Sequence, residues 1–288
     1  MARLVWLASY PKSGNTWMRA LIANFTADAP APASINALGP LLGSGAREPF
    51  DEWAGVKASH LPSSLVDRLR PEVYRCVARS EKDNVYVKVH DAWRLTPSGE
   101  PLFPADVTHG VEYIVRNPLD LVASNAHHAG VDLVTAAEQL CDPEYTLARP
   151  EQGLPSQLPQ KTLCWSGHVR SWLDLSPLPV HLVRYEDLHR DTPGTLAGVV
   201  RFCGLEPEPA RIRKAVAFSE FSELSRQERE RGFRERRPNS TAEFFRKGQI
   251  GSWTEELPSE LARRVVDAHH DTMERFGYLE QAAVPVGP

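Results

Sequence analysis

A short run of charged, hydroxyl-bearing and glycine residues near the N-terminus has the composition of an anion-binding loop. The string Y-P-K-S-G-N-T-W spans residues 10–17 and follows an apolar run. Lys12 supplies a positive charge, Ser13 and Thr16 supply hydroxyl donors, and Gly14 permits a tight turn. The free N–H groups at the start of the helix that we expect next add further donors. These residues predict an anion site in the first loop of the chain.

The order of residues in this loop differs from that of a nucleoside-triphosphate loop. The triphosphate pattern G-x-x-x-x-G-K-[ST] places the lysine last and follows it with a hydroxyl that binds magnesium. Here Lys12 precedes Gly14, and Asn15, Thr16 and Trp17 follow. Trp17 offers a flat face to a nucleobase, or it packs in the core as an ordinary helix residue. The order therefore argues against a magnesium-bound triphosphate and leaves open which anion the loop holds.

Two further cationic clusters also suit anions. Arg116 ends an apolar run in V-R-N-P-L-D-L-V-A-S, and Ser124 lies eight positions later on a predicted helix. Arginine binds phosphate in a bidentate manner and the helix start adds its dipole; the alternative is that Arg116 only pairs with Asp120. In F-F-R-K-G-Q-I-G-S-W, Arg246 and Lys247 precede a glycine. This pair fits a phosphate, and a solvated basic pair is the alternative.

Two segments combine a lysine with a nearby histidine, and each histidine is a candidate general base. V-Y-V-K-V-H places Lys88 and His90 two positions apart on a predicted strand, so that their side chains point the same way. V-K-A-S-H places Lys57 and His60 three positions apart, which a strand does not align. Asp91 is not expected to orient the imidazole of His90, because adjacent strand residues diverge. We predict that His90 is the base and keep His60 as the alternative.

Four apolar runs and the helical segments between them position these clusters. The runs cover residues 4–10, 85–89, 111–116 and 180–185. Helical periodicity covers residues 16–25, 117–130, 193–205 and 259–278. Near-continuous apolar runs that alternate with helices predict an α/β fold with an open parallel sheet, flanked by helices. Because ligands of such sheets bind at the carboxyl ends of the strands, where the polar clusters lie, we expect the clusters to meet at one edge.

Composition and charge limit the class of protein. A chain of 288 residues with 42% hydrophobic and 24% charged residues can bury one core, so we expect a single domain over residues 1–280 and a disordered tail over 281–288. Segments 26–56 and 141–160 are expected to form loops or lids. The charged segment 226–237 is expected to be mostly solvated. A net charge of −4 argues against nucleic-acid binding.

Other sequence features bear on where the protein resides. No apolar run is long enough to span a membrane, and the N-terminus lacks the pattern of a signal peptide. The four cysteines are widely spaced and do not have the spacing of a metal site. We therefore expect a cytoplasmic protein with reduced cysteines and without a bound metal. The oligomeric state stays open.

Taken together, these strings resemble the soluble, cytosolic sulfotransferases that use 3′-phosphoadenosine 5′-phosphosulfate (PAPS). The family loop Y-P-K-S-G-T-T-W matches residues 10–17, with Asn15 in place of threonine. The family motif R-K-G-x-x-G-D-W matches residues 246–253, with Ser252 in place of aspartate. The family arginine that is followed eight positions later by a serine matches residues 116–124. The matched motifs extend over nearly the whole chain.

The resemblance implies a P-loop-like fold and the transfer of a sulfuryl group from PAPS to a hydroxyl or amine of a small-molecule acceptor, for example a phenol. Adenosine 3′,5′-bisphosphate (PAP) is the product, and no metal takes part. The resemblance implies that Lys12 stabilises the leaving oxygen, and Lys88 is a candidate to share that task. His127 and His128 follow Arg116 and Ser124 on the predicted helix, which makes them candidates for the acceptor pocket. The implied donor-binding residues are Lys12, Ser13, Gly14, Asn15, Thr16 and Trp17 for the 5′ end, Arg116, Ser124, Arg246, Lys247 and Gly248 for the 3′-phosphate, and Tyr185, Ser219 and Phe221 for the adenine.

Two other functions are compatible with parts of the sequence. A small-molecule kinase of the P-loop type also needs an anion loop, but it requires the glycine-then-lysine order that is missing here. A non-catalytic nucleotide-binding module also needs anion loops, but it has no use for Lys88 and His90 at the same sheet edge. The sulfotransferase hypothesis accounts for all the strings.

Overall fold

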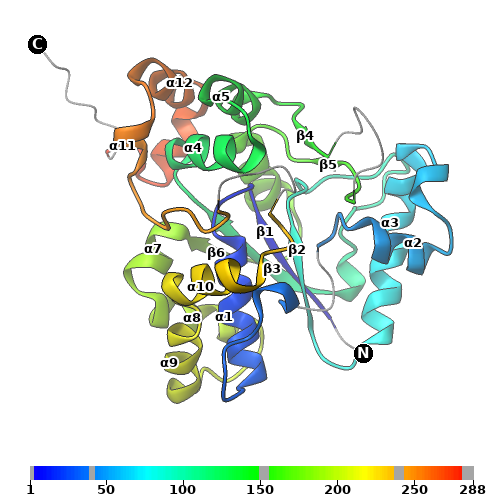
Figure 1. The fold of residues 1–288 in the computed structure, drawn as a ribbon. Coiled ribbons are helices and arrows are strands. Elements are labelled where there is room, and N and C mark those ends of the chain that lie inside the picture. The colour runs from blue at the N-terminus through cyan, green and yellow to red at the C-terminus, as the bar shows by residue number, and fades with distance from the viewer. Residues whose placement is uncertain (1–2, 39–42, 149–155, 237–242, 281–288) are drawn as a thin grey trace, which may run out of the picture.

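The computed structural model of the chain describes residues 3–38, 43–148, 156–236 and 243–280 and is built around a parallel β-sheet (Figure 1). Its strands are β1 (Leu4–Ser9), β2 (Val85–Val89), β3 (Thr108–Val115) and β6 (Val180–Arg184). They lie in the order β2-β1-β3-β6, and each pairs in parallel with its neighbours. The predicted strands and the predicted open α/β fold are therefore confirmed.

The two central strands, β1 and β3, are buried along nearly their whole length because helices cover both sides of the sheet. Within β1, Trp6 faces one apolar core and Leu7 faces another, and both side chains are fully buried. Complete burial of a side chain of this size contributes about 1.5–3 kcal/mol. A strand that is covered on both faces needs no polar alternation, which explains why the sheet is recognisable as near-continuous apolar runs.

The four predicted helices are present, with ends that differ by a few residues. They are α1 (Asn15–Ala27), α4 (Pro118–Ala129), α8 (Thr192–Phe202) and α12 (Ser259–Arg275). The start of α4 has a local cause, since the side chain of Asn117 accepts a hydrogen bond from the Leu119 N–H at 3.0 Å and Pro118 takes the first helical position. This start places the end of β3 and the beginning of α4 side by side.

Several elements were not predicted. The further helices are α2 (Arg47–Ala54), α3 (Ser63–Ser80), α5 (Leu133–Cys141), α6 (Trp165–Arg170), α7 (Tyr185–Arg190), α9 (Pro209–Ala217), α10 (Phe221–Arg231) and α11 (Trp253–Glu256). Shorter elements are η1 (Ile35–Ala37), η2 (Ala58–His60), η3 (Ala105–Val107), the π-helical turn η4 (Ser171–Leu175) and the hairpin of β4 (Thr146–Leu147) and β5 (Gln160–Lys161). Figure 1 shows α4, α5 and α12 together on one side of the molecule and α1, α8 and α9 on another, while α2 and α3 lie apart from both groups.

Two expectations about irregular segments need correction. Segment 26–56, expected to be a loop, contains η1 and α2, and segment 141–160 contains β4 and the first residue of β5. Both segments are held by packing that their proline- and glycine-rich composition does not reveal; Phe50 of α2, for example, is buried in a small apolar cluster. Residues 39–42 and 149–155 of these segments, and the predicted tail 281–288, lie outside the described residues.

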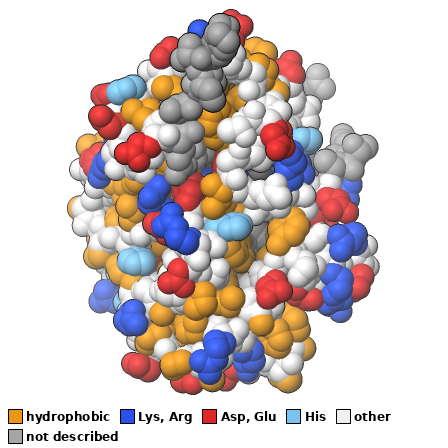
Figure 2. Space-filling view, turned by 90° about the vertical axis from the view of Figure 1, so that its left-hand side faces the viewer, with side chains coloured by type: hydrophobic (Ala, Val, Ile, Leu, Met, Phe, Trp, Pro, Cys, Tyr) orange, Lys and Arg blue, Asp and Glu red, His pale blue; other side chains and the backbone are white. Residues whose placement is uncertain are grey.

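The surface of the molecule carries charges of both signs. On the face shown in Figure 2, acidic and basic side chains are interspersed, and a group of basic side chains lies beside histidines near the centre. Anion binding on that face therefore depends on a local cluster and not on an extended basic surface. Among the described residues, no helix combines the length and the hydropathy that a membrane span requires.

Candidate active site

The loops that follow the four strands open into a cavity of about 1300 Å³. Lys12 follows β1, His90 follows β2, Arg116 follows β3 and Tyr185 follows β6, and all four line this cavity. Sites for a single small molecule usually measure about 300–1,000 Å³, so this cavity has room for a nucleotide and a second molecule. The structure thus brings the predicted clusters together at one edge of the sheet, as expected from the parallel order of the strands.

The first loop is held in an unusual backbone conformation by its neighbours. Lys12 and Gly14 have positive φ angles of 71° and 102°. A Cβ atom on Gly14 would lie 2.7 Å from Cδ2 of Tyr185, so only glycine fits there without moving the ring. The Asn15 amide donates to the Leu7 carbonyl at 2.7 Å, which ties the start of α1 back to β1. The loop is therefore a preformed turn at the beginning of a helix.

Lys12 is a partly buried cation close to the middle of this cavity. Its ammonium lies 3.7 Å from the centre of the Phe244 ring. Burial, together with the positive charges of Lys88 and Arg116, lowers the pKa of Lys12 to about 7. A lysine that is near half-protonation at neutral pH gains its full charge when an anion approaches, because an opposite charge favours the protonated form.

His90 has the geometry of a general base. Its Nδ1 lies 2.8 Å from the carbonyl oxygen of Ser9. A carbonyl only accepts hydrogen bonds, so Nδ1 carries the hydrogen and Nε2 keeps a free lone pair. Burial, and then the charge of Lys88, hold the pKa of His90 well below its ordinary value, so the imidazole is neutral. Asp91, as expected, does not orient this ring, since its buried carboxylate pairs with Arg70 at 2.5 Å.

Lys88, beside His90, is bound by a carboxylate that the sequence analysis did not identify. Glu235 Oε2 lies 2.7 Å from the Lys88 ammonium, and its Oε1 lies 2.5 Å from the guanidinium of Arg19. Burial alone would raise the pKa of Glu235, but the two cations hold it at about 2. The expectation that segment 226–237 is mostly solvated is therefore wrong for Glu235, because this residue folds back against β2. No local signal marks it, since the surrounding arginines and glutamates have the pattern of an exposed charged run.

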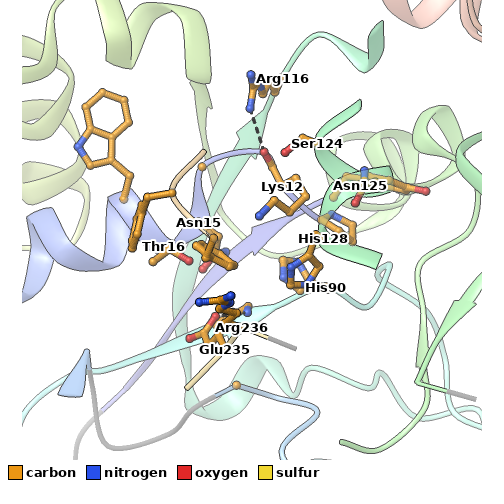
Figure 3. A pocket seen from close by; sticks show the side chains of 18 of the residues that line it. Lys12, Asn15, Thr16, His90, Arg116, Ser124, Asn125, His128, Glu235 and Arg236 are labelled. Carbon is orange, nitrogen blue, oxygen red and sulfur yellow. Dashed lines mark hydrogen bonds and ion pairs between the residues drawn. The ribbon is translucent and has the colours of Figure 1, made fainter. Parts of the chain in front are cut away.

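Arg116 links the first loop to the segment that precedes α11. Its guanidinium donates to the Lys12 carbonyl at 3.2 Å and to the Gln249 carbonyl at 2.8 Å, and it lies 4.3 Å from the centre of the Tyr185 ring. Figure 3 shows this arginine on one side of Lys12, joined to the lysine carbonyl by the dashed line. The alternative role, an ion pair with Asp120, is only a long contact of 3.8 Å. Arg116 therefore lines the cavity, and two nitrogens of its guanidinium already donate hydrogen bonds to backbone carbonyls.

The predicted phosphate cations Arg246 and Lys247 both pair with one internal carboxylate. The guanidinium of Arg246 donates to both oxygens of Glu256 at 2.8 and 2.9 Å, and the ammonium of Lys247 binds the same carboxylate. Next to them, a Cβ atom on Gly248 would lie 2.5 Å from the ring of Phe221. The three residues thus line the cavity as a compact turn, and the single carboxylate of Glu256 offsets only part of the positive charge of its two cations.

Aromatic rings form a wall that suits a flat nucleobase. Trp17 and Tyr185 meet edge to face at 5.9 Å between ring centres, and Trp17 meets His189 at 6.1 Å. All three rings line the cavity. Ser219 also lines it, although its hydroxyl accepts a hydrogen bond from the Asn24 amide at 3.0 Å and the residue is fully buried. The sequence analysis did not identify His189, whose only signal is its place one helical turn after the Tyr185 position.

The remaining predicted residues divide into those that reach the cavity and those that do not. Thr16, Ser124 and His128 line it. Ser13 is fully buried and is not among the residues that line the cavity. His60 lies exposed on η2, away from the described lining. Among the residues that the structure describes, no group of three or more histidine, cysteine or acidic side chains is arranged to hold a metal ion.

Comparison with known proteins relates this chain to one family. The family model described as "Sulfotransferase domain" matches residues 3–277. Flavonol 3-sulfotransferase of Flaveria bidentis is 23% identical over 91% of this chain and 78% of its own length. Cytosolic sulfotransferase 17 of Arabidopsis thaliana is 24% identical over 95% of this chain and 75% of its own length.

Solved structures show the same fold. Retinol dehydratase in complex with androsterone and the inactive cofactor PAP has a TM-score of 0.61 and 20% identity, and the match covers 95% of this chain and 82% of that one. A mouse sulfotransferase complexed with PAP also has a TM-score of 0.61, with 17% identity over 98% of this chain and 89% of that one. At these identities the likeness supports the fold.

Proposed function

We propose, because this chain belongs to the sulfotransferase-domain family, that its cavity binds PAPS and transfers the sulfuryl group to a hydroxyl or amine of a small-molecule acceptor. The membership confirms the resemblance drawn from the sequence motifs. The observation that carries the proposal is the meeting of Lys12, a neutral His90 and Arg116 in one cavity of about 1300 Å³. A cation at the leaving group, a base with a free lone pair and room for two molecules are the requirements of group transfer between a nucleotide and an acceptor.

The cavity wall matches the two anionic ends and the base of the donor. The first loop and the start of α1 suit the 5′-phosphosulfate, since Lys12 and the helix N–H groups favour negative charge. The 3′-phosphate suits the part of the wall formed by Arg116, Ser124 and the 246–248 turn. On binding, this phosphate would replace the Glu256 carboxylate as the partner of Arg246 and Lys247. Trp17 and Tyr185 suit the adenine ring. The PAP that accompanies the two solved structures supports this assignment by analogy.

The transfer step follows from the positions of His90 and Lys12. The acceptor hydroxyl gives its proton to Nε2 of His90 while its oxygen bonds to sulfur. The bond between sulfur and the bridging oxygen of PAPS breaks, and its electron pair stays on that oxygen, which becomes part of the phosphate of PAP. The charge of Lys12 stabilises the oxygen as it becomes negative. No step requires a metal ion.

The acceptor side of the cavity is formed by α4, α5 and the β4–β5 hairpin. His128, Gln139 and Tyr145 line this side and present polar atoms, while Ala136 and Leu140 present apolar surface. A mixed wall of this kind suits an acceptor with a ring system and a hydroxyl group, such as a phenol. His127 is exposed and lies outside the described lining.

The donor site is tested by thermal unfolding with PAP and with ATP–Mg²⁺, in the wild type and in Lys12→Ala. A ligand that binds only the folded state stabilises it by RT ln(1 + [L]/Kd), about 2.7 kcal/mol at one hundred times Kd. We expect stabilisation by PAP, a smaller effect in the variant and no effect of ATP–Mg²⁺. Stabilisation by ATP–Mg²⁺ in place of PAP would reject the sulfotransferase proposal and favour a kinase.

The base is tested by release of PAP from PAPS in the presence of a panel of phenols and amines. His90→Ala is expected to lower the rate by about 10²–10⁴-fold, the usual contribution of a positioned general base. His60→Ala is the matched control, because this histidine is exposed on η2. Equal rates for both variants would remove His90 from the mechanism. Binding of PAP without turnover of any acceptor would favour a nucleotide-binding module.

A further inference from the structure

We propose that Glu235 is a positioning residue of the sulfuryl-transfer site: its carboxylate holds Lys88 in place and offsets the positive charge that is crowded around Lys12. This inference rests on the proposed function. Glu235 lies in the segment after α10 and reaches Lys88 across 147 positions of the sequence. Its role is therefore set by the tertiary fold and not by any motif.

The geometry around Glu235 is that of a largely covered carboxylate whose two oxygens are both engaged. One oxygen binds Lys88 at 2.7 Å and the other binds Arg19 at 2.5 Å. The side chains of Arg19 and Glu235 are 3% and 14% exposed, so water screens these charges only weakly. Figure 3 shows Glu235 on the opposite side of Lys12 from Arg116, next to the space that His90 faces.

This carboxylate acts through lysines and not as a base. Both oxygens of Glu235 are engaged by cations, which hold its pKa at about 2, so it accepts a proton poorly at neutral pH. Its position beside Lys88 fixes a flexible side chain next to His90. A lysine that is tethered in this way keeps its ammonium at one place on the cavity wall. A free lysine side chain would lose conformational entropy when it became fixed there.

Glu235 also balances the charges that face Lys12. Lys88 on β2 and Arg116 at the end of β3 disfavour the charged form of Lys12, whereas Glu235 and Glu228 on α10 favour it. Glu228 is committed elsewhere, because its carboxylate accepts hydrogen bonds from two backbone N–H groups at 2.7 and 2.9 Å. Neutralising Glu235 would leave Lys88 unpaired and lower the pKa of Lys12 further below about 7.

The test is the pH dependence of PAP binding, measured by calorimetric titration of the whole chain from pH 5.5 to 8. Above the pKa of free Lys12, binding requires uptake of a proton, so the apparent Kd of the wild type rises by up to about tenfold per pH unit. In Glu235→Gln this rise begins at a lower pH. The ratio of the Kd of the variant to that of the wild type therefore increases with pH, by up to about tenfold at pH 8 for each unit of lowered pKa. Ionisation of PAP itself cancels in this ratio.

Three further variants separate this role from a merely structural one. Glu235→Asp keeps the charge and is expected to restore most of the pH dependence of the wild type. Glu230→Gln, which removes an exposed carboxylate of α10 that pairs with Arg226, is expected to leave the ratio at one. Lys88→Met removes a cation near Lys12, so the rise in Kd is expected to move to higher pH, opposite to Glu235→Gln. This last variant decides the matter if Glu235→Gln does not fold.

The outcomes distinguish this inference from the proposed function. If the wild type binds PAP and the ratio for Glu235→Gln is the same at every pH, Glu235 only supports the fold and the inference is wrong, while the proposed function stands. An unchanged pH dependence in Lys88→Met would also contradict the inference, because the charges of the Lys88–Glu235 pair would then not affect Lys12. If the wild type fails to bind PAP at any pH in this range, the proposed function fails and the inference fails with it.

Discussion

The contact between Gly14 and Tyr185 provides a direct test of how the first loop is built. Gly14 has a φ of 102°, and a Cβ atom there would lie 2.7 Å from Cδ2 of Tyr185. Ordinary contact between carbon atoms is about 3.5–4.0 Å, so in Gly14→Ala the ring must move by roughly 1 Å. The same ring lies against Trp17 and under the guanidinium of Arg116, so this movement disturbs the proposed adenine site.

The size of the effect follows from two separate costs. An alanine with a left-handed backbone costs about 1–2 kcal/mol, and overpacking against the ring costs about 1–3 kcal/mol more. Gly55→Ala is a matched control, because Gly55 also has a positive φ, of 66°, but no atom lies within 4 Å of its added Cβ. We expect the free energy of unfolding to fall by about 2–5 kcal/mol in Gly14→Ala and by about 1–2 kcal/mol in the control.

The two variants are compared by thermal unfolding and by titration with PAP. For a chain of this size each kcal/mol corresponds to about 2–4 °C in Tm. We expect Gly14→Ala to bind PAP at least about tenfold more weakly than Gly55→Ala, which corresponds to 1.4 kcal/mol. Equal PAP affinity in the two variants would show that the close approach of Tyr185 to the loop does not matter for the donor. Equal stability would show that the contact itself does not form.

Three other predictions concern charges. Glu256→Gln is expected to tighten PAP binding several-fold, because the 3′-phosphate no longer has to displace a carboxylate from Arg246 and Lys247. Weaker binding in calorimetric titration would mean that Glu256 positions these cations. Asp91→Asn is expected to lower the free energy of unfolding by about 3–5 kcal/mol in denaturant titrations, since it leaves its buried arginine partner uncompensated; a loss below 1 kcal/mol would contradict this. A hydrogen bond to a glutamate raises the pKa of His181. The stability that His181 contributes is therefore complete below its unfolded pKa near 6.5 and is lost as the pH rises through its pKa in the folded state. A free energy of unfolding that is higher at pH 8 than at pH 6, relative to His181→Gln, would contradict this.

The sheet and the anion loops follow largely from local patterns in the sequence. Residues 4–9 form a strand because every one of them is buried, and a strand covered on both faces is recognisable as an unbroken apolar run. The start of α4 follows from Asn117 and Pro118, whose cap and ring act on the nearest backbone groups. The parallel order of the strands then suffices to predict that polar residues at their carboxyl ends share one edge. The sequence already favoured His90 over His60, because Lys88 and His90 lie two positions apart on a strand, and the catalytic role of His90 remains a prediction.

Only the tertiary structure decided which partners these residues meet. The carbonyl of Ser9 sets the tautomer of His90, and Glu235 and Glu256 hold the cations of the cavity. The physical reason is that charge pairing acts through space. A glutamate in a run of arginines has the same local pattern whether it is solvated, as Glu230 is, or folded in against a lysine 147 positions away, as Glu235 is. The sequence by itself therefore determined the frame and the chemical groups of the site, whereas packing decided how those groups are oriented and charged.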